Sequence, residues 1–230
     1  MKTILLDIEG TTTPIDFVHK TLFPYAKSKI SAYVHKNYNS LAAEIAQIEF
    51  ERANDENYRD HLDIASPNSI SAYLEYLIDI DRKSGPLKTI QGKIWQEGYE
   101  SGELLSVVFD DVPPALERWR SEGKTIAIYS SGSVLAQQML FRYTVHGNLT
   151  PFISDYYDTN TGHKREAASY SKIAERIGFA PEEILFISDI AEELDAAGEA
   201  GFETLLSVRE GNTPVSEPSH TVIHSFDEIS

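Results

Sequence analysis

Residues 4–12 read ILLDIEGTT, a short apolar run that ends in two acidic residues, a glycine and two threonines. The apolar run predicts a strand from Ile4 to Ile8 that is buried on both faces of a parallel sheet. Because side chains alternate along a strand, Asp7 and Glu9 are predicted to point the same way. The glycine permits a tight turn, and the threonines offer hydroxyls and amides to an oxyanion. The stretch therefore predicts a strand end that binds phosphate and a hard cation, the alternative being an acidic strand end before a solvated turn.

Further apolar runs predict the rest of a sheet, with strands at residues 125–129, 184–187 and 204–208 and a short final strand, after a loop, at 221–223. Helical patterns precede three of these strands, and each pattern stops at a glycine, namely Gly123, Gly178 and Gly201. Helices that alternate with strands in this way are typical of parallel sheets. We expect an α/β fold with a doubly wound parallel sheet.

The segment from residue 16 to residue 105 interrupts this alternation. Its apolar residues recur at helical spacing, as in Leu41, Ile45 and Ile48, and it contains no convincing strand run. We interpret it as a helical lobe inserted after the first strand, where it would cover whatever is bound at the end of that strand. The predicted domains are an α/β core of residues 1–15 and 106–230 and a helical cap of residues 16–105.

Composition excludes several classes of partner and site. The chain has 20 Lys and Arg residues and 36 Asp and Glu residues, which gives a formal net charge of −16. A field of this sign repels nucleic acid and anionic lipid. The chain has no cysteine, so disulfides and Cys-ligated metals are excluded. Its first apolar run is too short for a signal peptide, and no run is long enough to span a membrane. We expect a cytoplasmic protein that contacts neither nucleic acid nor membrane.

Three more segments place reactive groups after predicted strands or before predicted helices. Ser130 and Ser131 lie in the sequence SSGS before a helix, where hydroxyls and amides bind anions, although a serine N-cap would look the same. Lys164, in Gly-His-Lys, could neutralise a phosphate, although such a lysine is often only solvated. Asp189 follows a buried strand and is suited to bind Mg²⁺ beside Asp7, although its charge could also favour the start of a helix. Acid, hydroxyl, lysine and acid, in this order, rarely occur together by chance.

The same order of motifs resembles the haloacid dehalogenase-like phosphatases, in which an apolar strand carries a nucleophilic Asp and a second acid two residues later. Glu9 stands where most of that superfamily has the second Asp. In this respect the chain resembles the enolase-phosphatases of methionine salvage, and the likeness extends over nearly the whole chain to the segments LFPY (22–25), DRK (81–83), YSSGS (129–133), GHK (162–164) and VREGN (208–212). Glu210 departs from the Pro expected there, a change that should affect only a loop.

The resemblance implies roles for particular residues. Asp7 would attack phosphorus to form an aspartyl phosphate, and Glu9 would handle a proton of the reaction. One Mg²⁺ per subunit would be held by Asp7, Glu9 and Asp189, with the donor at Glu9 being either its side chain or its backbone carbonyl. Lys164 would act in catalysis and bind phosphate. The other phosphate-binding residues would be Thr11, Thr12, Ser130 and Ser131.

The preferred reading is a bifunctional enzyme that enolises and then dephosphorylates a small phosphate ester. A Mg²⁺-dependent sugar-phosphate phosphatase or phosphomutase on the same core is the alternative, since only the substrate separates the two. A noncatalytic phosphate-binding protein is disfavoured because Asp7 and Asp189 are both present, and a dehalogenase is disfavoured because Lys164 and Asp189 suit a magnesium and phosphate site. The charge and the resemblance favour a monomer.

In the predicted cap, Lys88, Gln91 and Trp95 are candidate substrate contacts, although helical spacing could equally make Trp95 part of a core.

Overall fold

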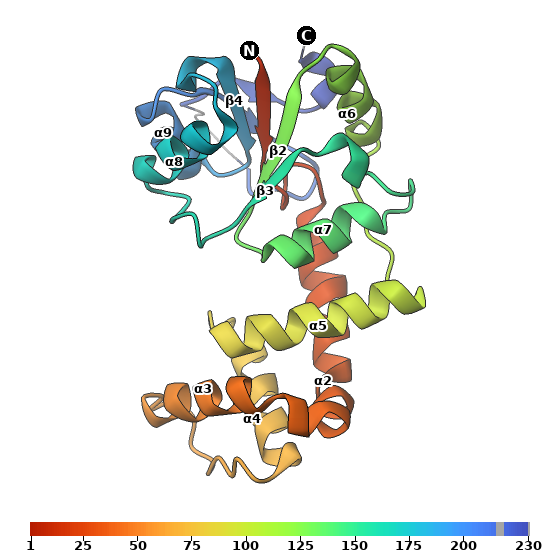
Figure 1. Cartoon of the computed structure of the whole chain (residues 1–230), viewed down its shortest axis with the longest axis vertical. Helices are drawn as coiled ribbons and strands as arrows, with labels where there is room; N and C mark the ends of the chain where they lie inside the picture. The colour runs from red at the N-terminus through yellow and green to blue at the C-terminus, as the bar shows by residue number, and fades with distance from the viewer. Residues whose placement is uncertain (215–218, 230) are drawn as a thin grey trace. The chain divides into compact units, whose positions relative to one another are not determined.

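The six strands of the sheet are parallel and follow the order β3-β2-β1-β4-β5-β6 (Figure 1). The structure is a computed structural model and describes residues 1–214 and 219–229. Residues 215–218, which belong to the predicted loop before the last strand, lie outside the described residues. The strands are β1 (Thr3–Leu6), β2 (Thr125–Tyr129), β3 (Asp155–Tyr157), β4 (Ile184–Ser188), β5 (Glu203–Ser207) and β6 (Val222–Ile223).

The predicted fold class is confirmed. β1 lies between β2 and β4, and both of these neighbours run parallel to it. Every residue of β1 and β4 is buried, as expected from their unbroken apolar runs. After β3 the chain crosses to the other side of β1, so the strand order reverses there, and the carboxyl ends of β1, β2 and β4 lie at this reversal. Ligands of open α/β sheets bind at such a point.

Helices cover both faces of the sheet (Figure 1). On one face, α8 and α9 pack in a core that includes Leu5, Phe186 and Tyr170. On the other, α6 packs on β2, and Trp119 of α6 is fully buried. The helices of this part of the chain are α6 (Val112–Ser121), α7 (Val134–Arg142), α8 (Ala167–Ile177) and α9 (Ala191–Glu199). Gly178 ends α8 with a φ of 80°, a left-handed conformation that glycine adopts without steric cost.

A separate cluster with its own core is formed by α2 (Phe23–Asn37), α3 (Ala42–Ala53), α4 (Pro67–Asp79) and α5 (Gly85–Ser101). The short helix α1 (Ile15–Phe17) belongs with the sheet and continues as a π-helical turn (Val18–Leu22). Ile30 of α2, Leu74 of α4 and Ile90 of α5 are fully buried in this core. The chain divides into a core unit of Met1–Val18 and Leu105–Ser230 and a helical unit of His19–Leu104.

Two details of the sheet differ from the sequence-based expectation. β3 was not predicted, because it has only three residues and begins with the exposed Asp155. β1 ends at Leu6 rather than at Ile8, so the strand alternation that was predicted to align Asp7 with Glu9 does not extend to Glu9. Glu9 lies instead in a turn and forms an isolated bridge with Thr13.

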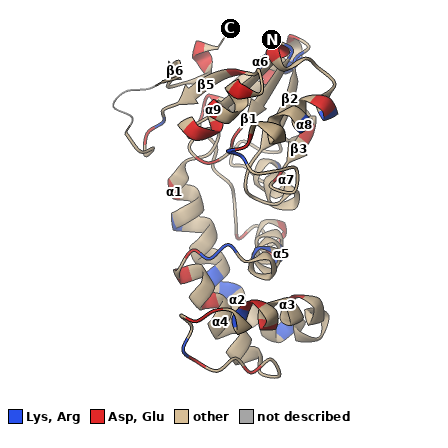
Figure 2. Ribbon diagram, turned by 90° about the vertical axis from the view of Figure 1, so that its left-hand side faces the viewer, with Lys and Arg blue, Asp and Glu red and all other residues tan. Residues whose placement is uncertain are grey.

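Acidic residues are spread over both units rather than gathered in one patch (Figure 2). Several pair with lysines on the surface, for example Glu183 with Lys2. Within residues 1–214 and 219–229, no helix combines the length and the hydropathy that crossing a bilayer requires.

Candidate active site

Asp7 lies at the carboxyl end of β1 and is buried. Its amide donates a hydrogen bond of 2.9 Å to the carbonyl of Ile187 in β4, which continues the strand pairing one residue beyond β1. The chain then turns, and the amides of Thr11, Thr12 and Thr13 all donate to the carbonyl of Ile8. The amides after Gly10 were predicted to bind an oxyanion. They instead donate hydrogen bonds within the turn. The turn fixes the backbone on either side of the Asp7 carboxylate.

The ammonium of Lys164 lies between two carboxylates. Its Nζ atom is 2.6 Å from Oδ1 of Asp7 and 2.6 Å from Oε2 of Glu193. Ser188, the last residue of β4, donates from its hydroxyl to Glu193 at 2.9 Å and to Asp7 Oδ2 at 3.4 Å. The side chains of Lys164, Asp7 and Glu193 are each about nine-tenths buried or more. Charge-assisted hydrogen bonds therefore hold the group together in a place of low solvent access.

The electrostatics of this cluster follow from burial and from the crowding of carboxylates. Burial by itself would lower the pKa of Lys164, but the charges of Asp7 and Glu193 raise it above its ordinary value, so the ammonium stays protonated. Burial, followed by the charge of Asp7, raises the pKa of Glu193 to about 7. The same two causes raise the pKa of Asp189 to about 8.

This charge balance suits a divalent cation. The cluster contains three carboxyl groups, from Asp7, Asp189 and Glu193, and one positive charge, the ammonium of Lys164. Because negative charge is in excess, a further cation would stabilise Asp7 and Asp189. Carboxylate and carbonyl oxygens are the donors that Mg²⁺ prefers. Within the described residues, no three His, Cys, Asp or Glu side chains are arranged to hold a metal ion. The donor set therefore fits Mg²⁺ if two carboxylates are completed by a backbone carbonyl and by waters.

Gly10 allows Asp189 to approach the turn after β1. Gly10 has a φ of 68°, and a Cβ atom placed on it would lie 2.2 Å from Oδ2 of Asp189 and 3.0 Å from Oδ1 of Asn212. The Gly10 carbonyl accepts from Asn212 Nδ2 at 2.9 Å and from the Ser207 hydroxyl at 3.2 Å. Only glycine suits this position, because the backbone is left-handed and a carboxylate occupies the space of a side chain.

The segment after β2 forms a loop that ends in a helix cap. Ser133 is the N-cap of α7, and its hydroxyl accepts from the amide of Ala136, as the serine N-cap interpretation expected. Ser130 is buried, and its hydroxyl accepts from the amide of Gly132 at 3.3 Å. Ser131 is exposed. Gln137 of α7 donates to the carbonyls of Gly132 and Tyr157, both at 2.9 Å, and so ties the loop to the end of β3.

The two predicted phosphate-binding threonines differ in their hydrogen bonds. The Thr12 hydroxyl donates to the backbone carbonyls of Asp7 and Ile8, both at 3.2 Å, and so stabilises the turn that carries the acid. The Thr11 hydroxyl is buried and has no hydrogen-bond partner among the described residues. A buried hydroxyl in this state is available to a ligand oxygen.

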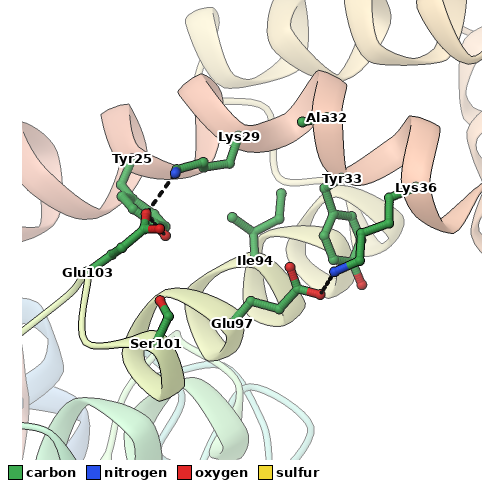
Figure 3. Close-up of a pocket in the computed structure, with 9 residues that line it drawn as sticks. All are labelled: Tyr25, Lys29, Ala32, Tyr33, Lys36, Ile94, Glu97, Ser101 and Glu103. Atoms are coloured by element: carbon green, nitrogen blue, oxygen red, sulfur yellow. Dashed lines mark hydrogen bonds and ion pairs between the residues drawn. The ribbon is translucent and has the colours of Figure 1, made fainter.

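The helical unit contains a cavity of about 220 Å³ between α2 and α5 (Figure 3). An ion pair lies near each end, Lys29 with Glu103 at 2.6 Å and Lys36 with Glu97 at 3.1 Å (Figure 3). None of the predicted site residues lines this cavity. Trp95 was predicted either to contact the substrate or to belong to a core. Its indole N–H donates to the Leu22 carbonyl at 2.9 Å, and its ring packs against the core of the helical unit, as the second alternative expected.

Two residues of the site, Glu193 and Asn212, had no predicted role. Glu193 lies in the first turn of α9 and precedes Leu194, which belongs to the buried stripe of that helix, whereas Glu192 is exposed. Its place beside the apolar stripe is the signal that could have separated it from Glu192. Asn212 lies in the loop after β5, and no local pattern links it to Gly10.

Comparison with known proteins gives consistent matches over the whole chain. A family model described as haloacid dehalogenase-like hydrolase matches residues 1–201. An enolase-phosphatase E1 of Synechococcus elongatus is 51% identical, with 99% of this chain and 97% of the relative covered. An enolase-phosphatase E1 of Drosophila persimilis is 45% identical, with 99% and 94% covered.

Solved structures are similar in fold. The UTR4 protein of Saccharomyces cerevisiae matches with a TM-score of 0.81 and 36% identity, and 98% of each chain is covered. A HAD phosphatase of Thermococcus onnurineus matches with a TM-score of 0.60 and 20% identity over 99% of this chain and 95% of the other, a likeness that concerns the fold alone.

Proposed function

Because the chain belongs to the haloacid dehalogenase-like hydrolases, and within them to the enolase-phosphatase family, we propose that it converts 2,3-diketo-5-methylthiopentyl-1-phosphate to an acireductone and phosphate. The reaction is a step of methionine salvage and yields 1,2-dihydroxy-3-keto-5-methylthiopentene. The observation that carries the proposal is the buried Asp7 carboxylate, which lies at a strand end in contact with the Lys164 ammonium and close enough to Asp189 to raise its pKa.

Phosphate release proceeds in two steps at Asp7. An oxygen of the Asp7 carboxylate attacks phosphorus, the bond from phosphorus to the enol oxygen breaks, and that oxygen leaves with the bonding electrons. An enol oxygen is less basic than an alkoxide, so its departure needs less help from a general acid. Water then attacks the aspartyl phosphate, which releases phosphate and restores the carboxylate.

Lys164 holds positive charge beside the reacting oxygens throughout both steps. Its ammonium already contacts Asp7, so a phosphoryl group transferred to Asp7 would lie next to it. In a buried site, a charge positioned in advance stabilises the transition state without reorganising solvent. Ser130, Ser131, Thr11 and Thr12 are the proposed ligands of the phosphoryl group, and the unpartnered hydroxyl of Thr11 within the described residues supports this role.

Asp7 and Asp189 are the proposed Mg²⁺ ligands, with Glu9 contributing through its side chain or its backbone carbonyl. When bound there, Mg²⁺ would draw negative charge from the phosphoryl oxygens. Support comes from the charge balance of the cluster, in which Asp189 carries a pKa raised by burial and by Asp7. We further propose one Mg²⁺ per subunit, a small-molecule phosphate ester as the partner, a monomeric state and a cytoplasmic location.

Glu9 is proposed to serve the enol chemistry, because a Glu side chain reaches one methylene further than the Asp found in most of the superfamily. Substitution Glu9→Asp should then slow enolisation or phosphate release. The idea fails if Glu9→Asp retains the wild-type rates of both reactions.

The test of the proposed function follows two signals in one reaction mixture. Purified protein, Mg²⁺ and the diketo phosphate are mixed, and enol absorbance and released phosphate are recorded separately. An enol signal that precedes metal-dependent phosphate release supports the proposal, and EDTA should stop the release. Asp7→Asn should reduce phosphate release by about 10⁴-fold or more, the size of loss found when a nucleophile or a group that acts with it is removed. Equal release of phosphate from many sugar phosphates without an enol signal would overturn the substrate assignment.

A further inference from the structure

The loop that carries Lys164 is held through its backbone by side chains from elsewhere in the core unit. Its successive carbonyls, from Thr161 to Lys164, each accept a side-chain hydrogen bond, from Lys172, Tyr129, Ser169 and Tyr170 respectively. Three of these donors belong to α8, and Tyr129 ends β2. Loop carbonyls are usually satisfied by water or by other backbone groups, so four consecutive side-chain partners are unusual.

The hydrogen bonds nearest to Lys164 are short, and the one that Tyr170 donates is buried. The Tyr170 hydroxyl donates to the Lys164 carbonyl at 2.7 Å, and the Ser169 hydroxyl donates to the His163 carbonyl at 2.7 Å. Tyr170 is fully buried, and burial raises the pKa of its phenol, so it remains a donor. Gly162 makes the approach of Ser169 possible, because a Cβ on Gly162 would lie 2.1 Å from the Ser169 hydroxyl oxygen.

Aromatic rings confine the Lys164 side chain as well. Its Nζ atom lies 5.7 Å from the centre of the Tyr129 ring and 6.0 Å from that of Phe186. Tyr170 packs edge-on against Tyr129, with 5.5 Å between ring centres, and is 5.2 Å from Phe186. A lysine side chain has several rotatable bonds and considerable rotamer entropy. A backbone held in place and walls of aromatic rings limit where its ammonium can lie.

We propose that Tyr170, together with Tyr129 and Ser169, positions Lys164 for phosphoryl transfer by holding the backbone of residues 162–164. These are positioning residues, since they act through Lys164 and do not touch the reacting atoms. The inference rests on the proposed function only in taking Lys164 to bind the phosphoryl group. Displacing such a group by about 1 Å costs on the order of 100-fold in rate, so loss of one of these hydrogen bonds has a measurable effect.

The test removes a single hydroxyl and keeps the ring. Tyr170→Phe is compared with Tyr156→Phe, because the Tyr156 hydroxyl is also buried but has no hydrogen-bond partner in the described part of the chain. We expect Tyr170→Phe to lower kcat for phosphate release by about 10- to 100-fold and to weaken the binding of inorganic phosphate, measured by calorimetry. Tyr156→Phe should leave both unchanged. Ser169→Ala provides a second variant, with a smaller loss in the same direction, if Tyr170→Phe does not fold.

A double-mutant cycle with Lys164→Ala separates positioning from general stability. If Tyr170 acts through Lys164, Tyr170→Phe weakens phosphate binding in the wild-type background and has no further effect in the Lys164→Ala background. Equal losses in the two backgrounds, or no difference between Tyr170→Phe and Tyr156→Phe, would overturn the inference. Because phosphate binding does not depend on which ester is the substrate, failure of the proposed enol reaction would be seen separately in the wild-type protein.

Discussion

The Nζ atom of Lys164 lies 2.6 Å from Oδ1 of Asp7, although the two residues are 157 positions apart in the chain. The contact forms because Asp7 ends β1, while Lys164 follows β3, two strands away in the sheet. Parallel strands bring their carboxyl ends to one edge, so groups that follow different strands meet there. Glu193 reaches the same ammonium from the first turn of α9.

Asp189→Asn should have opposite effects with and without Mg²⁺. Burial and the charge of Asp7 both oppose ionisation of Asp189, so an ionisable group at this position costs stability when no metal is bound. Replacing Asp189 by the neutral Asn should therefore raise Tm in EDTA by about 2–4 °C, the shift that about 1 kcal/mol produces in a chain of this size. Mg²⁺ should stabilise the wild type and leave the variant nearly unchanged, because a ligand stabilises only the state that binds it. Thermal unfolding with EDTA and with saturating Mg²⁺ measures both effects.

The control for Asp189→Asn is Glu192→Gln, at an exposed acid three residues later in the first turn of α9, which should behave as the wild type in both conditions. The prediction would be contradicted if Asp189→Asn had a lower Tm than the wild type in EDTA. It would also be contradicted if saturating Mg²⁺ raised the Tm of Asp189→Asn as much as that of the wild type.

Gly10→Ala should weaken Mg²⁺ binding beyond its effect on stability. The new Cβ would meet Asp189 Oδ2 at 2.2 Å, so the carboxylate must move, and such changes next to metal ligands cost about 10- to 100-fold in metal affinity. Gly123→Ala is the matched control, because Gly123 has a similar φ of 77° and no atom within 4 Å of its Cβ position. Both variants should lose about 1–2 kcal/mol from the left-handed backbone. Equal Mg²⁺ affinities in the two variants would refute the close approach of Asp189.

Glu193→Ala should destabilise the protein by about 2 kcal/mol, the usual size of a hydrogen bond to a charged group. The substitution removes the acceptor of both Lys164 and Ser188, while Asp7 remains as a partner of the ammonium. Glu192→Ala, at an exposed position one residue earlier, should change stability by less than about 0.5 kcal/mol. Urea unfolding of the two variants measures the free energy of unfolding. Similar losses in both would mean that the buried ion pair with Lys164 does not stabilise the protein.

Stability should fall at alkaline pH through Tyr73, in the core of the helical unit. Burial, followed by the charge of Asp55, raises the pKa of Tyr73 from 10.0 to about 12, and its hydroxyl donates to Asp55 at 3.3 Å. The unfolded chain loses this proton at lower pH than the folded one, so the contribution is complete below pH 10 and disappears between about pH 10 and 12.

Urea unfolding of the wild type and of Tyr73→Phe, from pH 9 to pH 12, measures this contribution. The difference in stability between the two proteins should shrink as the pH rises through this range. A difference that stays constant with pH would show that Tyr73 ionises at the same pH in both states.

Local pattern was sufficient to predict most of the sheet. β2 has the predicted bounds, and β4 begins at the predicted residue, because both are unbroken apolar runs next to clear turn signals. β3 escaped prediction because an edge strand of three residues, with the exposed Asp155 at its start, has no apolar run. The end of β1 was placed two residues too late, since Ile8 extends the apolar pattern while the turn at Gly10 already redirects the backbone.

The candidate site was predictable only where each residue belongs to a motif of its own. Asp7, Lys164 and Asp189 follow strands or precede helices in recognisable segments. Asn212 and Tyr129 lie in segments that carry the resemblance, but those segments predicted no role for them, and Tyr170 belongs to no such segment. Their roles depend on partners that are distant in the chain, as Asn212 depends on Gly10.

The sequence by itself determined the parallel sheet and the reactive groups at the ends of its strands, because apolar runs, glycines and acidic residues act over a few neighbouring positions. The tertiary structure alone decided that Glu193 shares the ammonium of Lys164 with Asp7, and that Tyr170 holds the backbone beneath it. Those contacts depend on strand order and on how α8 and α9 pack against the sheet. Their distances are set by the packing of the whole core unit, which no single stretch of sequence contains.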